Sequence, residues 1–389
     1  MSNIQSNIWK SYLIHIIGGL AFFVPIIVLF WQENGLTMTK IMVLQSLYSL
    51  TIVFLDIPTG YFADKFGRKT SLLFSSLFLF LGIFIYSLGH NFYQFLIAEV
   101  LWGTGVSFMS GADSALVYDT LKELKQEEYY KKIWGKLVFY GFIATAVANI
   151  LGGFIGKIDF RYTFYVMLPF YLLLFPIALS IKEPKRKEVI KKAGIKDIIN
   201  ILKVIYSNPK LKWFLVYSGI VYGFNSASLW LYQPYLQLIG LDIIYFGFVF
   251  ASFQIIAALA SKYSHKIEGY LGQKYSLIIL IFLITISYFL MSNFIYLFSF
   301  SFAFIQQFVR GFYRVVMTDY INKLVSSDIR ATVLSAQNMA GRLFYAAIIP
   351  IVGYIIDAYS LIQAITVLGI TTLIAGTFIL IILHRVKVI

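Results

Sequence analysis

The sequence predicts an all-α membrane protein of twelve transmembrane helices, arranged as two pseudo-symmetric bundles of six. The composition, the apolar runs and an internal repeat together predict it. Of the 389 residues, 59% are hydrophobic and only 13% are charged, whereas a soluble chain carries about 25% charged residues. A chain of this composition cannot bury its apolar surface in a core surrounded by water, so lipid is the expected solvent.

Twelve apolar runs follow one another along the chain. A helix of roughly 20 residues, rising 1.5 Å per residue, crosses a hydrocarbon layer of about 30 Å. The runs fall at 11–31, 38–60, 70–89, 92–118, 135–157, 161–181, 212–237, 243–263, 275–292, 294–320, 331–356 and 360–383. The first run is too long for the core of a signal peptide and lacks a small-residue cleavage site, so we expect it to remain as the first helix.

The basic residues predict the orientation of these helices, because cytoplasmic loops carry an excess of Lys and Arg. With the N-terminus in the cytoplasm, 26 of the 32 basic residues fall on the cytoplasmic side, three fall outside and three lie within apolar runs. We therefore expect a multi-pass protein of the plasma (inner) membrane with both termini in the cytoplasm. The net charge of +14 belongs to these loops, so it does not indicate a nucleic-acid partner.

An internal repeat and a polar stretch divide the chain near its middle. At a shift of 200 residues Gly111 falls on Gly311, and at a shift of 205 Gly67 falls on Gly272, as duplicated transporter halves predict. We expect an N-terminal bundle, a cytoplasmic linker and a C-terminal bundle, with bounds of 1–181, 182–211 and 212–389. Within the linker, apolar residues recur at helical spacing against Lys and Asp, which predicts an amphipathic helix bound to membrane lipids.

The link between the second and third predicted helices holds the most specific pattern in the chain. Its residues are Gly60, Asp64, Gly67, Arg68 and Lys69. The pattern resembles the signature loop of the major facilitator superfamily and lies where that family has it. The resemblance implies the family's fold over essentially the whole chain and transport of a small molecule by alternating access. It also implies that Asp64 lies near the start of the eleventh helix and that Arg68 pairs with Asp119, closing the two halves on the cytoplasmic side.

Carboxylates inside the predicted spans are the candidates for proton coupling. An ionised group at the centre of a span costs about 2.5–3.5 kcal/mol, so it usually faces a cavity or a partner. Glu99 and Asp113 lie on the fourth predicted helix and Asp56 lies on the second. Glu99 is the first candidate for reversible protonation, and a structural hydrogen bond to a neighbouring helix is the alternative.

The resemblance also implies that the first, fourth, seventh and tenth helices line a central cavity. The expected substrate-cavity residues, including one on the eleventh helix, are His15, Phe22, Trp102, Tyr222, Asn225, Gln233, Gln306, Arg310, Tyr313, Arg314 and Arg342. Arg310 lies at a depth similar to that of Asp113, so it either pairs with that carboxylate or binds an anionic substrate. Each aromatic residue taken alone fits packing or lipid contact equally well. Pro25 and Pro234 are expected to kink the first and seventh helices.

The resemblance, the intramembrane carboxylates and the aromatic lining favour a proton-coupled antiporter that exports amphipathic organic compounds, similar to the bacterial drug efflux members of the family. Those antiporters carry Gly-Pro ahead of Gly-Gly in the fifth helix, whereas here Asn149 stands in place of the proline. Uptake or export of a specific metabolite, including an anionic one, stays open. So does a lipid flippase or a receptor that transports nothing.

Patterns typical of other classes of protein are missing from the sequence. The chain has no Cys, which excludes disulfides, thiolate metal sites and thiol nucleophiles. It has no phosphate-binding Gly-Lys-Ser/Thr loop, no His-rich metal spacing and no nucleophile triad. We therefore expect no enzyme activity, no cofactor, no metal and no obligate protein partner.

Overall fold

A computed structural model describes residues 4–185, 205 and 207–388. Every regular element within these residues is helical. The first half contains α1 (Ser6–Gly19), α2 (Ile27–Glu33), α3 (Met38–Phe66), α4 (Arg68–Leu88), α5 (Phe92–Met109), α6 (Ala112–Glu123), η1 (Glu127–Tyr129), α7 (Tyr130–Ile158) and α8 (Tyr162–Ser180). The second half contains α10 (Pro209–Ala227), η2 (Ser228–Trp230), α11 (Tyr232–Leu238), α12 (Ile243–Asn293), η3 (Leu297–Phe302), α13 (Ala303–Leu324), α14 (Ser327–Ala358) and α15 (Leu361–Arg385).

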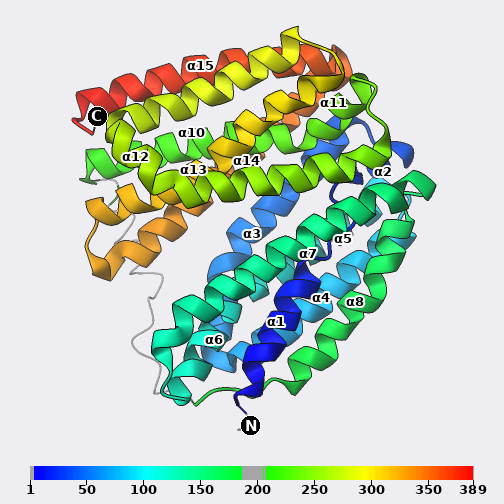
Figure 1. The fold of residues 1–389 in the computed structure, drawn as a ribbon, viewed down its shortest axis with the longest axis vertical. Coiled ribbons are helices and arrows are strands. Elements are labelled where there is room, and N and C mark those ends of the chain that lie inside the picture. The colour runs from blue at the N-terminus through cyan, green and yellow to red at the C-terminus, as the bar shows by residue number, and fades with distance from the viewer. Residues whose placement is uncertain (1–3, 186–204, 206, 389) are drawn as a thin grey trace. The chain divides into compact units, whose positions relative to one another are not determined.

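These helices account for the twelve predicted spans (Figure 1). The first span consists of α1 and α2, the fourth of α5 and α6, and the seventh of α10 and α11, while α12 contains both the eighth and the ninth. Eight of the described helices are long and apolar enough to cross a membrane. Of the others, α1 is short, α10 begins among lysines, and α13 carries several charged residues.

Contacts divide the chain into two compact units, each containing one short segment from the other half of the sequence. Unit 1 comprises Met1–Leu36, Leu47–Lys191 and Asp242–Ala251, and unit 2 comprises Thr37–Ser46, Lys192–Leu241 and Ser252–Ile389. The start of α3 thus packs in unit 2, and the start of α12 packs in unit 1. The predicted domain bounds of 1–181, 182–211 and 212–389 stay a prediction. The amphipathic linker helix was expected at 195–205, where the structure describes Ile205 alone.

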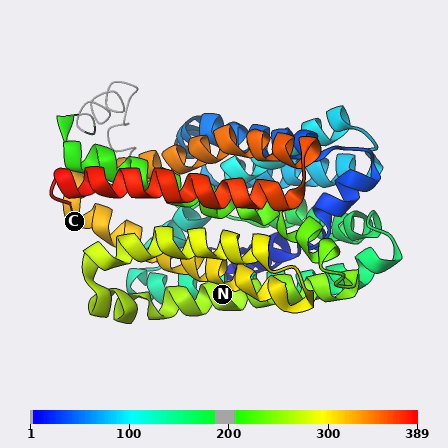
Figure 2. The same cartoon turned by 90° about the horizontal axis from the view of Figure 1, so that it is seen from above.

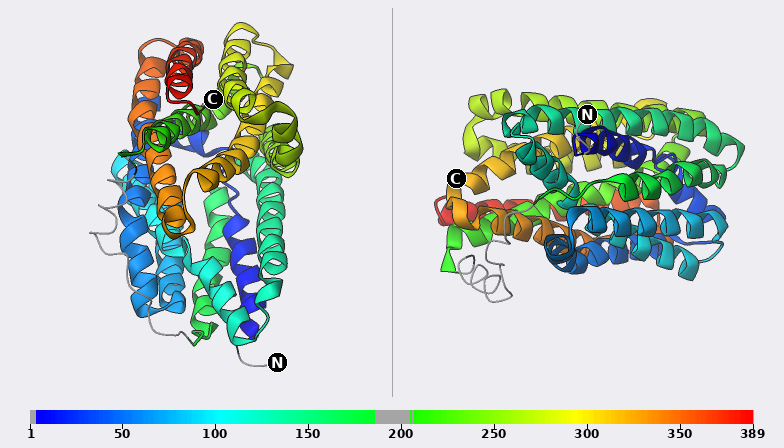
Figure 3. Two further views of the ribbon diagram at one scale, coloured as in Figure 1. Left: turned by 90° about the vertical axis from the view of Figure 1, so that its left-hand side faces the viewer. Right: turned by 90° about the horizontal axis from the view of Figure 1, so that it is seen from below.

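Unit 1 is held together by helices that approach closely at small residues. In it, α4 packs against α5 and α8, and α1 packs against α7 and α8 (Figure 3). A Cβ atom on Gly105 of α5 would lie 2.7 Å from the Leu79 Cγ of α4, so only glycine fits there. The Ser75 hydroxyl of α4 donates to the Gly105 carbonyl at 2.8 Å. Small residues that allow such contact are the usual means of packing helices in lipid.

Unit 2 uses the same kind of packing. Helix α10 lies against α14 and α15, and α14 runs beside α15 (Figure 2). A Cβ atom on Gly223 of α10 would lie 2.3 Å from the Phe344 ring, and one on Gly341 of α14 would lie 2.9 Å from the Tyr222 ring. The two helices therefore interlock, each with a glycine that receives an aromatic ring of the other.

Polar contacts hold the two exchanged segments. In unit 1 the Lys157 ammonium of α7 lies 2.6 Å from the Asp242 carboxylate just before α12. The hydrogen bond from Lys157 lowers the pKa of this exposed carboxyl below its usual value. In unit 2 the Asp357 carboxylate of α14 accepts from the Met38 and Thr39 backbone N–H groups at 2.9 and 2.7 Å. An anion at the N-terminus of α3 also suits the dipole of that helix.

Some predicted helix bounds were wrong because a glycine or proline changed the chain direction inside an apolar run. The first predicted helix is broken at residues 20–26, around Pro25, and the fourth is broken at Gly111, which has a φ of 76°. The eighth and ninth predicted helices share the label α12, but the chain breaks between them at Gly272, where φ is 70° and ψ is 170°, within the predicted gap of 264–274. The seventh predicted helix is interrupted by the 3-10 turn η2, and Pro234 lies in the first turn of α11, which follows it. This interruption is close to the kink predicted at Pro234.

Backbone geometry supports the internal repeat. Gly67 and Gly272, which the shift of 205 residues aligns, both have positive φ, at 113° and 70°. The same shift aligns Gly35 with Gly240, and both have a φ of 78°. Glycine adopts this conformation without the steric cost that other residues meet. Equivalent turns therefore precede and follow the equivalent helices of the two halves.

We predict that Gly153→Ala destabilises unit 1, because the new Cβ would lie 2.7 Å from the Ile244 carbonyl oxygen and 3.0 Å from the Gly247 nitrogen. Overpacking of this kind typically costs about 1–3 kcal/mol. Thermal unfolding of the purified protein measures the effect. The matched control is Gly135→Ala on the same helix, where nothing lies within 4 Å of the new Cβ. Equal melting temperatures for the two variants would contradict the packing of α12 against α7.

Candidate functional site

Several predicted site residues lie among other polar side chains of their own unit. In unit 1 His15 lies beside Asp113. In unit 2 Gln306 is bonded to Tyr232 and Arg310 to Gln254. Of the helices that carry these residues, α1, α11 and α13 are not among those that are long and apolar enough to cross a membrane. Polarity and breaks in a span are expected where it lines a water-filled path rather than lipid.

In unit 1 the break after α5 places Asp113 beside His15. Gly111 turns the chain, α6 begins at Ala112, and Asp113 lies in the first turn of that helix, where the helix dipole favours an anion. The His15 Nε2 atom lies 3.5 Å from the Asp113 Oδ2 atom, and both side chains are slightly exposed, at 17% and 19%. The Trp134 ring meets the His15 ring edge-on. The break in the fourth predicted span thus brings a carboxylate and an imidazole side by side.

Glu99, the first sequence candidate for protonation, lies in a closed environment. It is 6% exposed on α5, and its carboxylate accepts from the Tyr86 hydroxyl at 2.5 Å. The Tyr86 ring stacks on the rings of Phe95 and Phe164. That Glu99 lies within the membrane stays a prediction. The hydrogen bond to α4 is the structural alternative that the sequence left open.

In unit 2 the Tyr232 hydroxyl is the centre of a buried hydrogen-bond network. It donates to Gln306 Oε1 at 2.6 Å, accepts from Gln307 Nε2 at 3.0 Å and contacts Ser228 Oγ at 2.7 Å. Tyr232, Gln306 and Gln307 are at most 3% exposed. The Gln306 Nε2 and Gln307 Oε1 atoms have no hydrogen-bond partner. An unsatisfied amide is costly inside lipid-surrounded protein, so these atoms are candidates for ligand contact.

Arg310 lies one turn further along α13. Its guanidinium donates to the Gln254 Oε1 atom of α12 at 2.8 Å. Gly311 allows α13 to come close enough to α12 for this hydrogen bond. A Cβ atom at position 311 would lie 2.1 Å from the Ala257 carbonyl oxygen. Only glycine lets α13 approach α12 so closely. The sequence identified Arg310 but not Gln254, since nothing in the spacing of residues 56 positions apart indicates that they meet.

A second polar group lies further along α13. The Tyr313 hydroxyl contacts Ser218 Oγ at 2.6 Å, and Gln337 Nε2 donates to the same Ser218 oxygen at 2.7 Å. The amide oxygen of Asn225, on α10, has no hydrogen-bond partner. Tyr313 and Asn225 were predicted cavity residues, whereas Ser218 and Gln337 were missed because serine and glutamine are common in helices of every kind.

Other predicted cavity residues are packed within their own unit. Phe22 is 4% exposed and lies against Phe170. The Trp102 ring lies between those of Phe23 and Tyr171. Gln233 is 1% exposed, and Tyr222 packs on Gly341. Arg342 is half-buried and Arg314 is exposed. The proton-coupling candidate Asp56 is also half-buried. Packing is therefore the simplest role for Phe22 and Trp102.

The signature loop brings its charged residues together. The Arg68 guanidinium lies 2.7 Å from Asp64 and 3.8 Å from Asp119. The Glu183 carboxylate, which sequence reasoning missed, accepts from the Arg68 and Lys69 backbone N–H groups, both at 2.8 Å. It satisfies the free donors at the start of α4. The predicted approach of Asp64 to the eleventh helix stays a prediction.

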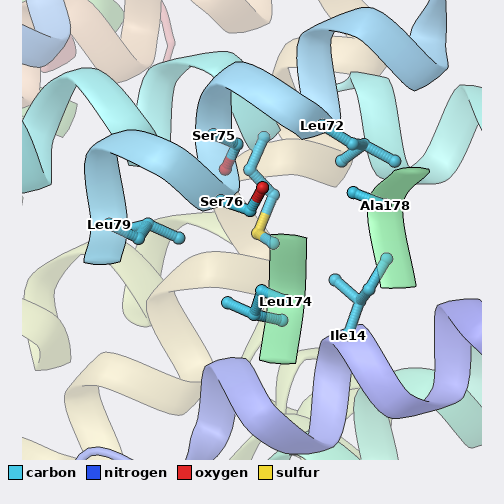
Figure 4. Close-up of a pocket in the computed structure, with 8 residues that line it drawn as sticks. Ile14, Leu72, Ser75, Ser76, Leu79, Leu174 and Ala178 are labelled. Atoms are coloured by element: carbon cyan, nitrogen blue, oxygen red, sulfur yellow. The ribbon is translucent and has the colours of Figure 1, made fainter. Parts of the chain in front are cut away.

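A small pocket in unit 1 lies apart from these polar groups (Figure 4). It is lined by Ile14, Leu72, Ser75, Ser76, Leu79, Met109, Leu174 and Ala178. The hydroxyls of Ser75 and Ser76 already donate to backbone carbonyls, so the pocket offers a ligand mainly apolar contact. Among the described residues no group of His, Asp or Glu is arranged to hold a metal ion.

Two bacterial proteins are similar to this chain in sequence. It is 22% identical over 262 residues to YxaM of Bacillus subtilis, described as an uncharacterized MFS-type transporter, covering 64% of both chains. It is 21% identical over 169 residues to the quinolone resistance protein NorA of Staphylococcus aureus, covering 43% of this chain and 42% of NorA. The matches thus span less than two thirds of the length of these relatives.

Two solved transporters share the fold over almost the whole chain. The nucleoside transporter NupG superposes with a TM-score of 0.81 at 12% identity, covering 98% of this chain and 99% of NupG. A D-xylose-proton symporter superposes with a TM-score of 0.72 at 15% identity, covering 97% of each chain. At these identities the likeness establishes the fold alone.

The sequence profile of the Major Facilitator Superfamily matches residues 11–346. This match confirms the family that the signature loop indicates, and with it the prediction of a multi-pass membrane transporter rather than an enzyme. The chain belongs to the Major Facilitator Superfamily.

Proposed function

We propose that this transporter exports amphipathic organic compounds in exchange for protons. The His15–Asp113 pair carries the proposal, because it places a carboxylate and an imidazole 3.5 Å apart on membrane-spanning helices while leaving both partly exposed. The similarity to NorA, whose name records quinolone resistance, supports export of organic compounds.

The pair suits proton coupling better than Glu99 does. A coupling group has to exchange its proton with water on each side in turn, and this requires exposure. Asp113 is 19% exposed at a helix break. Glu99 is enclosed by stacked aromatic rings and hydrogen-bonded to Tyr86. We therefore assign Glu99 to the stability of the α4–α5 contact and keep Asp56 as a further candidate.

Coupling follows if the proton and the substrate favour different conformations. A proton on the Asp113 carboxylate removes its charge and its attraction to His15. The end of α1 and the start of α6 then lose a contact that favours the present arrangement. A ligand shifts a conformational equilibrium by its differential affinity for the two states, and two ligands that act on one equilibrium become coupled.

The signature loop is proposed to act as the cytoplasmic gate. Its residues are Gly60, Asp64, Gly67, Arg68, Lys69 and Asp119. Arg68 lies between two carboxylates, at 2.7 Å from Asp64 and 3.8 Å from Asp119. Arg68 begins α4, whereas Asp64 is on α3 and Asp119 is on α6. A shift of α4 towards one of these helices and away from the other would change the partner of this arginine.

We predict that Asp113→Asn abolishes uphill export driven by a pH gradient and spares downhill exchange of the same compound. Transport of fluorescent amphipathic compounds in proteoliposomes measures both. The control is Asp319→Asn, an exposed acidic residue whose charge is paired with Lys323. Unchanged uphill export by Asp113→Asn would remove this carboxylate from the mechanism. Loss of uphill export in Glu99→Gln alone would transfer the role to Glu99.

We predict that Tyr86→Phe lowers the thermal stability of the purified protein. Glu99 would lose a hydrogen bond at a buried carboxylate, and such bonds are worth about 1.5–3 kcal/mol. The matched control is Tyr93→Phe on the outer end of α5, where the tyrosine is 74% exposed. If both variants melt at the wild-type temperature, the Tyr86–Glu99 contact does not stabilise the α4–α5 packing.

A further inference from the structure

Arg310 is a charged residue in a transmembrane helix that has no carboxylate partner among the described residues of unit 2. The ion pairs that the structure shows in that unit lie elsewhere, as with Asp319 and Lys323. The guanidinium donates one hydrogen bond, to the neutral Gln254. A guanidinium has five N–H donors, so most of its donors are available to another acceptor.

The position of this guanidinium is fixed by packing. Gly311 places α13 against the backbone of α12 at Ala257, and the hydrogen bond to Gln254 orients the side chain. The next basic residue on the helix, Arg314, is exposed. Binding sites gain affinity when their groups are already held in place, because less ordering is needed on binding. Arg310 meets this condition and Arg314 does not.

The neighbouring glutamines add donors to the same part of α13. Gln306 lies one turn before Arg310, and Gln307 lies three residues before it. The Gln306 Nε2 atom is buried and has no hydrogen-bond partner. The Tyr232 hydroxyl cannot satisfy it, since that hydroxyl already contacts Gln306 Oε1, Gln307 Nε2 and Ser228 Oγ. A buried donor next to a charged donor requires an acceptor that the described residues do not supply.

We propose that Arg310, supported by Gln306, binds an anionic oxygen group of the substrate, and that the exported amphipathic compounds are therefore carboxylates or similar anions. The inference rests on the proposed function and names its substrate class. A planar guanidinium matches the two oxygens of a carboxylate. The positive charge disfavours ammonium compounds, and a neutral amide forms weaker hydrogen bonds at the same place.

Three small aromatic probes test this assignment: 1-naphthoate, its neutral amide and naphthylmethylammonium. Their binding to the purified protein in detergent is followed by the shift in melting temperature as each concentration rises. Wild type is expected to bind naphthoate most tightly. Arg310→Gln is expected to lose about tenfold to a hundredfold in affinity for naphthoate, the range for a hydrogen-bonded charged group, and to retain its affinity for the amide.

Two further variants separate recognition from folding and from net charge. Arg310→Lys keeps the charge without the two-pronged geometry, so its affinity for naphthoate should fall between those of wild type and Arg310→Gln. Lys323→Gln removes one positive charge from the exposed end of the same helix and should bind naphthoate as wild type does. Equal losses in Lys323→Gln and Arg310→Gln would show a general charge effect and overturn the proposal.

A lipid phosphate is the other source of an anionic oxygen group, so short-chain phosphatidylglycerol is titrated in parallel. Binding of that lipid through Arg310, with no binding of naphthoate, would overturn the assignment to substrate, and so would tighter binding of the ammonium probe. These outcomes differ from failure of the proposed function. Proton-driven export of ammonium compounds would leave the function standing and remove the inference, whereas Arg310-dependent naphthoate binding without proton-driven export would do the reverse.

Discussion

Hydrocarbon offers no hydrogen-bond partner, and the rest of the structure depends on this constraint. Each polar group on a membrane-spanning helix has to be satisfied by protein or has to face water. Glu99 meets the first condition through Tyr86. Arg310 meets it only partly, through one neutral amide, whereas Asp113 lies beside the His15 imidazole and accepts from the Ser114 backbone N–H. Under the proposed function, these charged groups mark the path that a solute takes.

Glycine makes this arrangement of polar groups possible. With little hydrophobic force between helices in lipid, close packing supplies much of the stability. Gly311 brings α13 onto α12 and with it Arg310 onto Gln254, and Gly105 brings α4 onto α5 beside the Tyr86–Glu99 contact. The same residues that stabilise each unit thus determine which polar side chains meet.

Polar contacts of two kinds hold the short exchanged segments. The start of α12 is fixed in unit 1 by Lys157 and Asp242, and the start of α3 is fixed in unit 2 by Asp357. The shift of 200 residues that relates the two halves aligns Lys157 with Asp357, so equivalent positions on α7 and α14 hold equivalent segments by different chemistry.

Composition and the signature loop were enough to predict the fold, because lipid requires most spans to be long and apolar. The repeat predicted the equivalent turns at Gly67 and Gly272, which positive φ values bear out. The break at Gly111 could not be predicted in this way, since an apolar run has the same composition whether the helix bends or continues.

The site was predictable only in part. Arg310 and Asp113 stood out as charges in apolar runs, but their partners could not be identified from spacing. Gln254 lies 56 residues before Arg310 and Glu183 lies 115 residues after Arg68. Such contacts depend on which helix faces which, and a single sequence does not contain that information.

The central claim is that charged groups without a full set of hydrogen-bond partners lie on the path of the solute. Because the chain contains no cysteine, a single introduced cysteine tests this claim most directly. A single cysteine is introduced at Arg310 or at Glu99, and each variant is exposed in membrane vesicles to a charged, membrane-impermeant thiol reagent. The account predicts that the cysteine at 310 reacts and the cysteine at 99 does not, because position 310 is proposed to lie on the solute path, whereas Glu99 is 6% exposed and hydrogen-bonded to Tyr86. An unreactive cysteine at 310 together with a reactive one at 99 would contradict it.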